Sequence, residues 1–444
     1  MINTNSNKID KLRKLKDQLI LVAKEKKEPL FIYDKEEVRQ NIRDFKRAFS
    51  ENSVNVKIFY ATKSNPYLGL MKTVVAEGEF LDVSSQRELK LALQAGARKI
   101  IYTGPAKTEQ DFNLILQHHE KITVNLESFR ELKLLNEIAE KTGVTMRCGL
   151  RVLTGSQKGW TKFGMPLGRL KEFYDESQHF KNIHFCGIHF HISMNKTPEP
   201  YISTLNEIGE YLQEKFSPNE LAQFEYIDMG GGFYPEIWDG IYPWNKEQEI
   251  KYINNVGLLD QIYADEFQPR FIPTVISPIA EFGKQIAEIF HEKISPLLPN
   301  IELYAEPGRF ISHSSMHLLV NLVETKEEKP DVFIGITDGG NNMVGWEKYQ
   351  FCNYVPIFNL SQWDEKREIP FITYGSLCTP DDIWGYYLYT KGQPQEGDVL
   401  VLPYQGAYTF TLAQNFIKDI PDVYEIGNML AELSVLYPNI FPRK

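Results

Sequence analysis

The chain has 444 residues, of which 42% are hydrophobic and 13% aromatic; this composition can bury a large core and excludes a disordered protein. The length is compatible with one large barrel and one companion domain. With 49 lysines and arginines against 59 aspartates and glutamates, the formal charge is −10. The chain therefore lacks the excess of basic residues that nucleic-acid binding requires, which favours a small-molecule substrate.

The cysteines and the N-terminus bear on where the protein works. The 4 cysteines are scattered and form no C-x-x-C pair, which argues against a disulfide framework and favours a reducing cytoplasm. Residues 1–29 contain one short unbroken apolar run, at 19–23, far below a signal-peptide core or a membrane span. Apolar residues there recur at near-helical spacing and predict an amphipathic helix that packs on the protein: Ile9, Leu12, Leu15, Leu19 and Val22.

From Lys57 onward, short β-branched or aromatic runs alternate with amphipathic helical stretches, as in βαβ units around a parallel sheet. The predicted strands are 57–61, 80–84, 99–103, 122–126, 145–152, 183–192, 224–229 and 301–306. Helices lie between them, such as 86–95 and 128–141, which Gly96 and Gly143 close. Eight such units predict an α/β fold with a closed (β/α)8 barrel. An open doubly wound sheet is the competing fold, but the sequence has neither of the nucleotide-binding glycine motifs G-x-G-x-x-G and G-x-x-x-x-G-K-[ST].

After Arg309 the pattern changes to strand-like runs at 332–337, 371–374 and 398–403, separated by turn-rich segments, which predicts a mostly β C-terminal domain. The connection from 230 to 300 is far longer than an ordinary βα loop. It carries four aromatic residues soon after a strand end: Tyr234, Trp238, Tyr242 and Trp244. We expect this connection to form a lid or pocket wall over the barrel mouth, or else an elaborated surface loop.

The active site of a (β/α)8 barrel lies at the C-terminal ends of its strands. Polar and glycine residues end six of the predicted strands: Lys63, Asp82, Arg151, His191, Gly230–Gly232, and Glu306 with Arg309. Each alone has an ordinary explanation, such as a solvated cation, a tight turn or a structural ion pair. Together they suggest pyridoxal phosphate, because that cofactor needs an amine for a Schiff base, a phosphate nest and a carboxylate at its ring nitrogen.

A metal site is the other interpretation of these strand ends. His189 and His191 are two residues apart on one strand and point to the same side, so with Asp82 and Glu306 they could bind a metal. No other histidine falls at a predicted strand end. We therefore expect no metal, with the imidazole of His191 stacked on a cofactor ring and His189 packed deeper in the strand.

Six ordered motifs carry a resemblance that spans nearly the whole chain. They lie at residues 29–34, 60–65, 230–233, 306–309, 375–382 and 406–409. Through them the sequence resembles the fold-type III pyridoxal-phosphate decarboxylases, the ornithine and diaminopimelate decarboxylase family. The resemblance implies a pyridoxal-phosphate-binding barrel over 36–309 and a β domain over 310–444 that carries substrate and dimer-interface residues. It also implies that the N-terminal segment, 1–35, joins the β domain.

The resemblance also implies roles for single residues. Lys63 forms the Schiff base with pyridoxal 5'-phosphate, His191 stacks on its ring, and Glu306 pairs with the ring nitrogen. The other residues similar to the family's cofactor ligands are Asp82, Glu88, Arg151, Gly230, Gly231, Gly232, Arg309 and Tyr408, with Ser193 or a neighbour at the phosphate. Cys378 resembles the cysteine that a second subunit inserts to protonate the quinonoid carbon, which implies a homodimer with shared active sites. Asp382 and Phe416 are expected to reach the same pocket.

The implied reaction is decarboxylation of an amino acid or an amino-acid-derived substrate, and several departures from the family concern that substrate. Thr379 follows the cysteine where diaminopimelate and ornithine decarboxylases have an acidic residue for the distal amine. Trp346 stands near the position of an arginine that binds substrate carboxylate in the diaminopimelate enzymes. Asp338 and Asp382 remain available for a cationic tail. The Cys-Thr-Pro-x-Asp motif resembles a secondary-metabolism subgroup that acts on larger, modified or carrier-linked amino acids.

Several alternatives stay open at this point. The chain could be a diaminopimelate, ornithine or lysine decarboxylase in the strict sense, or a catalytically silent relative that binds the cofactor or a partner as a regulator. Intact Lys63, Glu306 and Cys378 favour catalysis, and Glu306 favours decarboxylation over the racemisation of barrel relatives that have arginine there. Cofactor-carrier proteins of the same barrel type lack the β domain. A metal-dependent hydrolase comes last, and neither a nucleic acid nor a membrane is expected as a partner.

Overall fold

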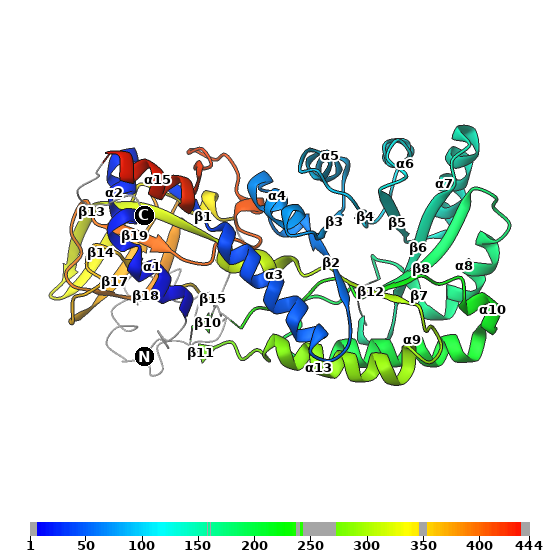
Figure 1. Ribbon diagram of the computed structural model, residues 1–444. Helices are drawn as coiled ribbons and strands as arrows, with labels where there is room; N and C mark the ends of the chain where they lie inside the picture. Colours follow the sequence, from blue (N-terminus) through cyan, green and yellow to red (C-terminus); the bar gives the residue numbers. More distant parts are fainter. Residues whose placement is uncertain are drawn as a thin grey trace. The chain divides into compact units, whose positions relative to one another are not determined.

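The computed structural model describes residues 7–157, 159, 161–236, 240–242, 272–345 and 353–436. The chain divides into two compact units (Figure 1). The barrel unit comprises Val38–Glu236 and Ile276–Ile311. The β unit comprises Met1–Glu37, Ile237–Val275 and Ser312–Lys444.

The barrel unit is built around eight parallel strands. They are β2 (Val56–Ala61), β3 (Phe80–Val83), β4 (Ile100–Tyr102), β5 (Ile122–Leu126), β6 (Met146–Leu153), β8 (Ile183–His189), β9 (Tyr226–Asp228) and β12 (Glu302–Ala305). Their order is β5-β4-β3-β2-β12-β9-β8-β6, and pairing of β5 with β6 closes the ring. The short β7 (Met165–Pro166) adds to β6. The predicted (β/α)8 barrel is therefore confirmed, with one strand in each of the eight predicted ranges.

Local sequence signals explain several of the helices around these strands. α3 (Lys35–Ser50) precedes β2, and the others follow the strands: α4 (Leu68–Ala76), α5 (Gln86–Gln94), α6 (Glu109–Leu116), α7 (Phe129–Thr142), α8 (Leu170–Ser177), α9 (Glu199–Lys215), α10 (Pro218–Leu221), α13 (Ile279–Ile289) and α14 (Gly308–Ser312). Figure 1 shows α5, α6 and α7 next to β3, β4 and β5. Ser85 and Ser128 cap α5 and α7 by accepting the backbone N–H groups of Glu88 and Glu131. Gly143 ends α7 in the left-handed region, at φ 70°.

Aromatic side chains fill part of the barrel interior. Tyr226 of β9 stacks on Tyr304 of β12, with ring centroids 4.9 Å apart and planes 7° from parallel. Phe59, Ile101 and Cys186 complete this buried cluster. These residues come from β2, β4, β8, β9 and β12, so the cluster joins strands from several parts of the barrel.

The β unit is built around an eight-stranded sheet, which confirms the predicted mostly β domain. Its strands are β1 (Leu30–Tyr33), β13 (Met316–Lys329), β14 (Val332–Thr337), β16 (Phe358–Asn359), β17 (Glu368–Tyr374), β18 (Ile383–Lys391), β19 (Val399–Leu402) and β20 (Val423–Glu425). The order is β16-β19-β13-β14-β17-β18, with β1 added on β13 and β20 on β1. β1, β13, β16, β18 and β20 lie outside the predicted strands. The charged second half of β13 lacks the alternating apolar pattern that predicts a strand.

The N-terminal segment packs within the β unit. It forms α1 (Asn7–Lys14) and α2 (Lys16–Lys26), two helices with Leu15 between them. Ile9, Leu12, Leu19 and Val22 are buried in a cluster with residues of β13, β19 and α15 (Ile426–Leu436). The apolar face therefore packs on the protein, as predicted. Among the described residues, no helix combines the length and the apolar character that crossing a bilayer requires.

The long connection after β9 is described at its ends. β10 (Gly240–Ile241) pairs with β11 (Ile272–Pro273) and with β15 (Asn353–Tyr354), all within the β unit. The predicted barrel range of 36–309 thus contains a stretch whose described strands belong to the other unit. Tyr242 packs edge-on against Tyr354, with centroids 5.5 Å apart. Trp238 and Trp244 lie outside the described residues, so the lid stays a prediction.

Candidate active site

Lys63 lies just beyond the C-terminal end of β2, in the short helix η1 (Thr62–Ser64). The Thr62 hydroxyl donates to the carbonyl of Asp82 at 2.8 Å, which fixes this turn beside β3. The Lys63 Nζ lies 3.9 Å from Asp82 Oδ2, and its side chain is 34% exposed. The structure therefore places a reachable primary amine next to a buried carboxylate at the barrel end that carries active sites.

Glu306 follows β12 and lies between two histidines. Its Oε2 is 3.3 Å from His191 Nδ1, and its Oε1 is 3.3 Å from His189 Nε2, the latter without hydrogen-bond alignment. Burial alone would raise the pKa of Glu306, but the two histidines and Lys63 hold it well below its ordinary value. Burial and the charge of Lys63 lower the pKa of His191 to about 3. At neutral pH an ionised carboxylate therefore lies beside a neutral imidazole.

The strand that carries the two histidines is shorter than predicted. It was predicted to run to Ile192, whereas β8 ends at His189 and His191 follows it. His189 is fully buried in the strand, as predicted, and its ring also faces the Glu306 carboxylate. The period-two rule predicted that the two histidines share a side, and it holds because both approach the same carboxyl group.

Two further buried acids accompany Glu306. Burial and the charge of Glu306 raise the pKa of Asp82 well above its ordinary value, against the opposing effect of Lys63. Asp228, at the end of β9, accepts the Gly230 N–H at 2.9 Å, and burial and Glu306 raise its pKa as well. The second oxygen of Asp228, Oδ2, is buried and has no hydrogen-bond partner among the described residues. The predicted site omitted Asp228, although its place at a strand end directly before the glycine triplet was a usable signal.

The Gly230–Gly232 triplet packs against two neighbouring strand ends. Gly230 and Gly232 have φ of +66° and +94°, and a Cβ on Gly232 would lie 1.8 Å from the Ile192 carbonyl. The Gly231 N–H donates to His191 Nδ1 at 3.0 Å, whereas the Gly232 N–H donates to no described residue. This close approach requires glycine and leaves one backbone donor available for an anion.

Ser193 belongs to the chain segment after β8, whose residues Ile192 and Asn195 approach this triplet. Asn195 ties the segment down, because its backbone N–H donates to the Gly232 carbonyl at 2.9 Å and its side-chain amide donates to the Ile192 carbonyl at 3.0 Å. Arg309 follows Glu306, and its guanidinium lies 4.9 Å from the Tyr234 ring centroid. Ser193 and Arg309 are both expected at the phosphate. Each therefore lies close in sequence to a residue that contacts another strand end of the site, Asn195 for Ser193 and Glu306 for Arg309.

Arg151 and Glu88 are held by partners at the same end of the barrel. Arg151 donates to Glu127 Oε1 at 3.1 Å, and its guanidinium lies 4.4 Å from the Phe163 ring centroid. The predicted site did not include Glu127, whose other oxygen accepts the Gly164 N–H at 3.1 Å. The carboxylate of Glu88 accepts the Ser84 N–H at 2.7 Å, so Glu88 stabilises the start of α5 just after the strand that carries Asp82.

The remaining predicted site residues belong to the β unit, where three loops lie together. Cys378 is exposed and free in the loop between β17 and β18. Hydrogen bonds join this loop to residues 339–342, and others join those residues to 414–418, next to the half-exposed Phe416. Thr379 follows Cys378, and Tyr408 adopts a positive φ of 57°. Trp346 lies outside the described residues.

The two β-unit aspartates are already engaged by the protein. Asp382 is buried and accepts the N–H groups of Asn341 at 2.7 Å and Leu377 at 2.6 Å. Asp338 accepts both the backbone N–H and the side-chain amide of Asn321, at 2.8 and 2.6 Å. Each oxygen of the two carboxylates therefore already accepts one N–H of the protein, and their availability for a cationic tail stays a prediction.

Comparison with known proteins gives the family of this site. The sequence model described as "Pyridoxal-dependent decarboxylase, pyridoxal binding domain" matches residues 35–270, more than half of the 444 residues. The chain belongs to the pyridoxal-dependent decarboxylases. It is a carboxy-lyase that uses pyridoxal phosphate and acts on an amino-acid substrate.

Individual relatives agree with this assignment. The chain is 28% identical over 408 residues to diaminopimelate decarboxylase of Methanothermobacter thermautotrophicus, covering 87% of this chain and 84% of the relative. It is 25% identical to the Staphylococcus aureus enzyme of that name, covering 87% and 86%. The Methanocaldococcus jannaschii diaminopimelate decarboxylase structure superposes with a TM-score of 0.75 at 21% identity, covering 91% and 88%. A Vibrio vulnificus lysine/ornithine decarboxylase complexed with cadaverine has a TM-score of 0.70 at 20% identity, covering 96% and 98%.

The described residues fit pyridoxal phosphate. Glu306 Oε1 is buried and accepts no hydrogen bond from a described residue, and its carboxylate is held ionised, as a protonated ring nitrogen requires. The Gly232 N–H suits a phosphate oxygen, and the Lys63 amine is accessible. When bound, the cofactor supplies an electron sink for the pair of electrons released with CO2.

Proposed function

We propose that the protein decarboxylates an amino-acid substrate with Lys63 as the residue that binds pyridoxal phosphate covalently. The observation that carries this proposal is the position of the Lys63 amine, 3.9 Å from Asp82 and at the same barrel end as the buried, ionised Glu306. An amine activates a carbonyl compound when it is accessible and has partners that tune its charge. Lys63 meets both conditions.

The other barrel residues then have definable tasks. Glu306 accepts the ring N–H of the cofactor and keeps that nitrogen protonated, while the neutral imidazole of His191 covers one ring face. The raised pKa of Asp228 keeps this acid protonated, so it adds no second negative charge to the buried pocket. Arg151 and the Gly230–Gly232 amides orient the phosphate side. The remaining proposed cofactor ligands are Asp82, Glu88, Ser193, Arg309 and Tyr408.

In this proposal Cys378 returns a proton to the α carbon, and the thiol comes from a second subunit of a homodimer. Its exposure within its own chain supports that role, as does the half-exposed Phe416 on a neighbouring loop. A thiol is a competent general acid when it lies within hydrogen-bonding reach of the carbon that takes up the proton. A reducing cytoplasm, which the sparse cysteines favour, keeps it in the thiol form.

The proposed substrate is a larger or modified amino acid rather than a simple diamino acid. Thr379 offers no charge to a distal amine, and the carboxylates of Asp338 and Asp382 are engaged by N–H groups of the protein. A buried distal ammonium needs a charged partner, because leaving it unpaired costs ~3–5 kcal/mol. The competing candidates are diaminopimelate, on which the relatives act by name, and lysine or ornithine.

The first experiment tests the cofactor and its attachment. We expect the purified protein to show a visible absorption band that bleaches with borohydride, and peptide mapping to find a phosphopyridoxyl group on Lys63. A colourless protein that does not take up added pyridoxal phosphate would contradict the proposal. A coloured protein that releases no CO2 from any amino acid would instead favour the silent regulator.

The second experiment tests the substrate. CO2 release is compared for diaminopimelate, lysine and ornithine and for side-chain-acylated forms of the same amino acids, in wild type, Thr379→Glu and the neutral control Thr379→Gln. We expect wild type to prefer the acylated forms and Thr379→Glu to shift kcat/KM toward the free distal amines. If wild type already prefers a free diamino acid and Thr379→Glu causes no shift, the pocket assignment is wrong.

A further inference from the structure

A second group of potential metal ligands lies at the opposite end of the barrel from Lys63. His184 and Cys186 are near the start of β8, and Glu225 directly precedes β9, so the group joins two adjacent strands. The other group with this potential among the described residues, His189, His191 and Glu306, is part of the cofactor site. The group formed by His184, Cys186 and Glu225 takes no part in the proposed reaction.

A β-bulge sets the position of the thiol. Cys148 of β6 pairs with Phe185 and Gly149 pairs with Gly187, so Cys186 is an extra residue on β8. A bulge redirects a side chain and bends its strand locally. The Glu225 N–H donates to the Cys186 carbonyl at 2.7 Å, which holds the carboxylate residue next to the bulge.

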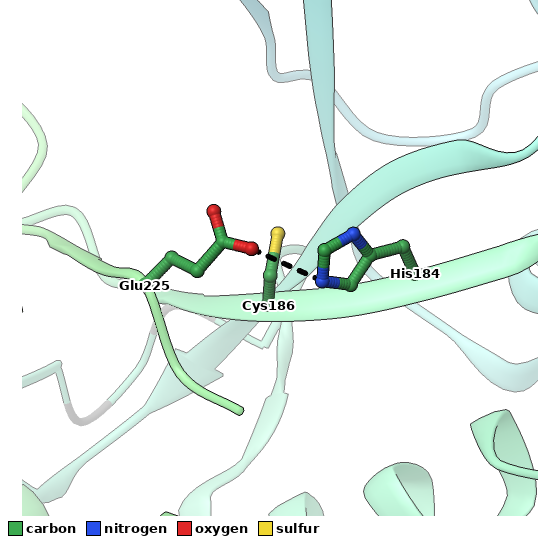
Figure 2. A group of neighbouring side chains, drawn as sticks. All are labelled: His184, Cys186 and Glu225. Carbon is green, nitrogen blue, oxygen red and sulfur yellow. Dashed lines mark ion pairs between the residues drawn. The ribbon is translucent and has the colours of Figure 1, made fainter. Parts of the chain in front are cut away.

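The three ligand atoms converge on one point. His184 Nε2 lies 3.1 Å from Glu225 Oε1, and both atoms lie within 4.8 Å of the Cys186 sulfur. Figure 2 shows the sulfur beside the line that joins the carboxylate to the imidazole. Tetrahedral zinc bonds of ~2.0–2.3 Å place ligand atoms roughly 3.3–3.8 Å apart. The group therefore needs shifts of about 1 Å or less to surround an ion.

Exposure and charge around the group are compatible with ion entry. The side chains of His184 and Glu225 are 40% and 39% exposed, whereas Cys186 is buried. Arg147 donates to the second oxygen of Glu225 at 2.6 Å, which leaves Oε1 directed at His184. Ligating carboxylates are commonly oriented by such an outer partner. The arginine charge opposes a cation, so the site is weaker than a closed four-cysteine site.

The simpler interpretation treats these residues as structural. His184, Glu225 and Arg147 would form an ordinary ion-pair cluster at the barrel rim, and Cys186 would be a small apolar residue whose S–H donates to the Cys148 carbonyl at 3.6 Å. That interpretation accounts for each residue separately. It gives no reason for a bulge that brings the thiol to an exposed histidine–carboxylate pair.

We propose that His184, Cys186 and Glu225 bind a divalent transition-metal ion of the zinc class, with water as the fourth ligand. Nitrogen, sulfur and oxygen donors in one tetrahedral site suit zinc and cobalt better than calcium or magnesium. Binding exchanges the Cys186 S–H bond for a sulfur–metal bond, and the proton leaves to solvent. Because the ion joins β8 to β9 away from the cofactor, its expected effect is on barrel stability.

Cobalt and zinc binding to the cofactor-loaded protein test this proposal. With Co²⁺ we expect a near-ultraviolet thiolate charge-transfer band that saturates at one equivalent per chain. Cys186→Ala should abolish the band, and His184→Gln should weaken binding by about a hundredfold. Cys378→Ala, which removes the exposed thiol, is the matched control and should leave the band intact. Zn²⁺ should raise the thermal unfolding midpoint of wild type but not of Cys186→Ala.

His184→Gln keeps the test decisive even if Cys186→Ala folds poorly, because residue 184 is partly exposed. Absence of a charge-transfer band in wild type would overturn the proposal. A band that survives in both site variants, or that disappears in Cys378→Ala, would assign the metal to another site. A zinc-induced stabilisation that is equal in all variants would do the same.

Discussion

The two units of the molecule differ in how their buried and half-buried carboxylates are paired. In the barrel unit, Asp82, Asp228 and Glu306 each have one buried oxygen that accepts no hydrogen bond from a described residue. Burial raises the pKa of acids in both units, Asp228 as well as Asp338 and Asp382, so the pairing of the oxygens is what distinguishes them. In the β unit, both oxygens of Asp338 and of Asp382 accept N–H groups of the protein. Incompletely paired buried acids mark a place where a ligand completes the structure, whereas fully paired acids brace loops.

This difference assigns separate tasks to the two units. The barrel unit holds the cofactor chemistry, because its acids depend on one another and on Lys63 for their charge. The β unit supplies loops that Asp382 and Asp338 hold in shape, with Cys378 and Thr379 exposed or half-exposed on one of them. Substrate preference should then follow from the side chains on these loops rather than from the two carboxylates that support them.

The largest expected effect is that of Lys63→Ala, which removes the amine from the barrel site. We expect turnover to fall by about 10³-fold or more, because the protein loses the amine that holds the cofactor covalently and, with it, a proton-transfer group. The visible absorption band should also be lost. Absorption spectra measure the band, and stopped-flow kinetics measure turnover on the same sample. If this variant decarboxylates as fast as wild type, the reaction does not depend on Lys63 and the incompletely paired acids have another role.

Cys378→Ala tests whether the β unit contributes a proton donor to the reaction. The expected result is a kcat about 10²-fold lower, within the usual range for a positioned general acid, with the cofactor band unchanged. Products should include those of misdirected protonation, which product analysis by mass spectrometry detects. If kcat and the products equal those of wild type, the β unit supplies no proton and its role is confined to shape.

Asp382→Asn tests whether the β-unit carboxylate is a brace. An amide has one acceptor oxygen, so the N–H of Leu377 or Asn341 loses its partner, at a cost of about 1–3 kcal/mol. We expect a thermal midpoint lower by a few degrees and a smaller loss of kcat than in Cys378→Ala. Asp381→Asn changes an exposed neighbour and serves as control. An unchanged midpoint with a raised KM for distal-amine substrates would instead assign Asp382 to substrate binding.

Much of the barrel follows from the sequence, because its strands are short apolar runs separated by amphipathic helical stretches, three of which begin with a side-chain cap. The strand-end rule then selects Lys63, His191 and Glu306, since side chains at those ends must meet. It did not select Glu127, which acts through Arg151 and belongs to no recognisable motif. The bracing of Asp382 was also beyond reach, because its partners are backbone N–H groups that any residue carries.

Asp228→Asn has the smallest expected effect and sharpens the comparison most, because it converts an incompletely paired acid into a neutral group. The amide can accept the Gly230 N–H and, like the protonated acid, carries no charge, so activity should be retained. The raised pKa of Asp228 means that its stabilising contribution is complete below the unfolded-state value, about 3.9, and is lost as pH rises toward the folded-state value.

Asparagine does not titrate, so the advantage of Asp228→Asn over wild type should grow from pH 4 to pH 8. Each unit of pKa shift corresponds to about 1.4 kcal/mol. Thermal midpoints of the cofactor-free proteins at several pH values measure this difference, with Asp381→Asn as the exposed control. A difference that does not depend on pH would mean that Asp228 is ionised in the folded protein, and that Glu306 does not need a protonated neighbour to hold its own charge.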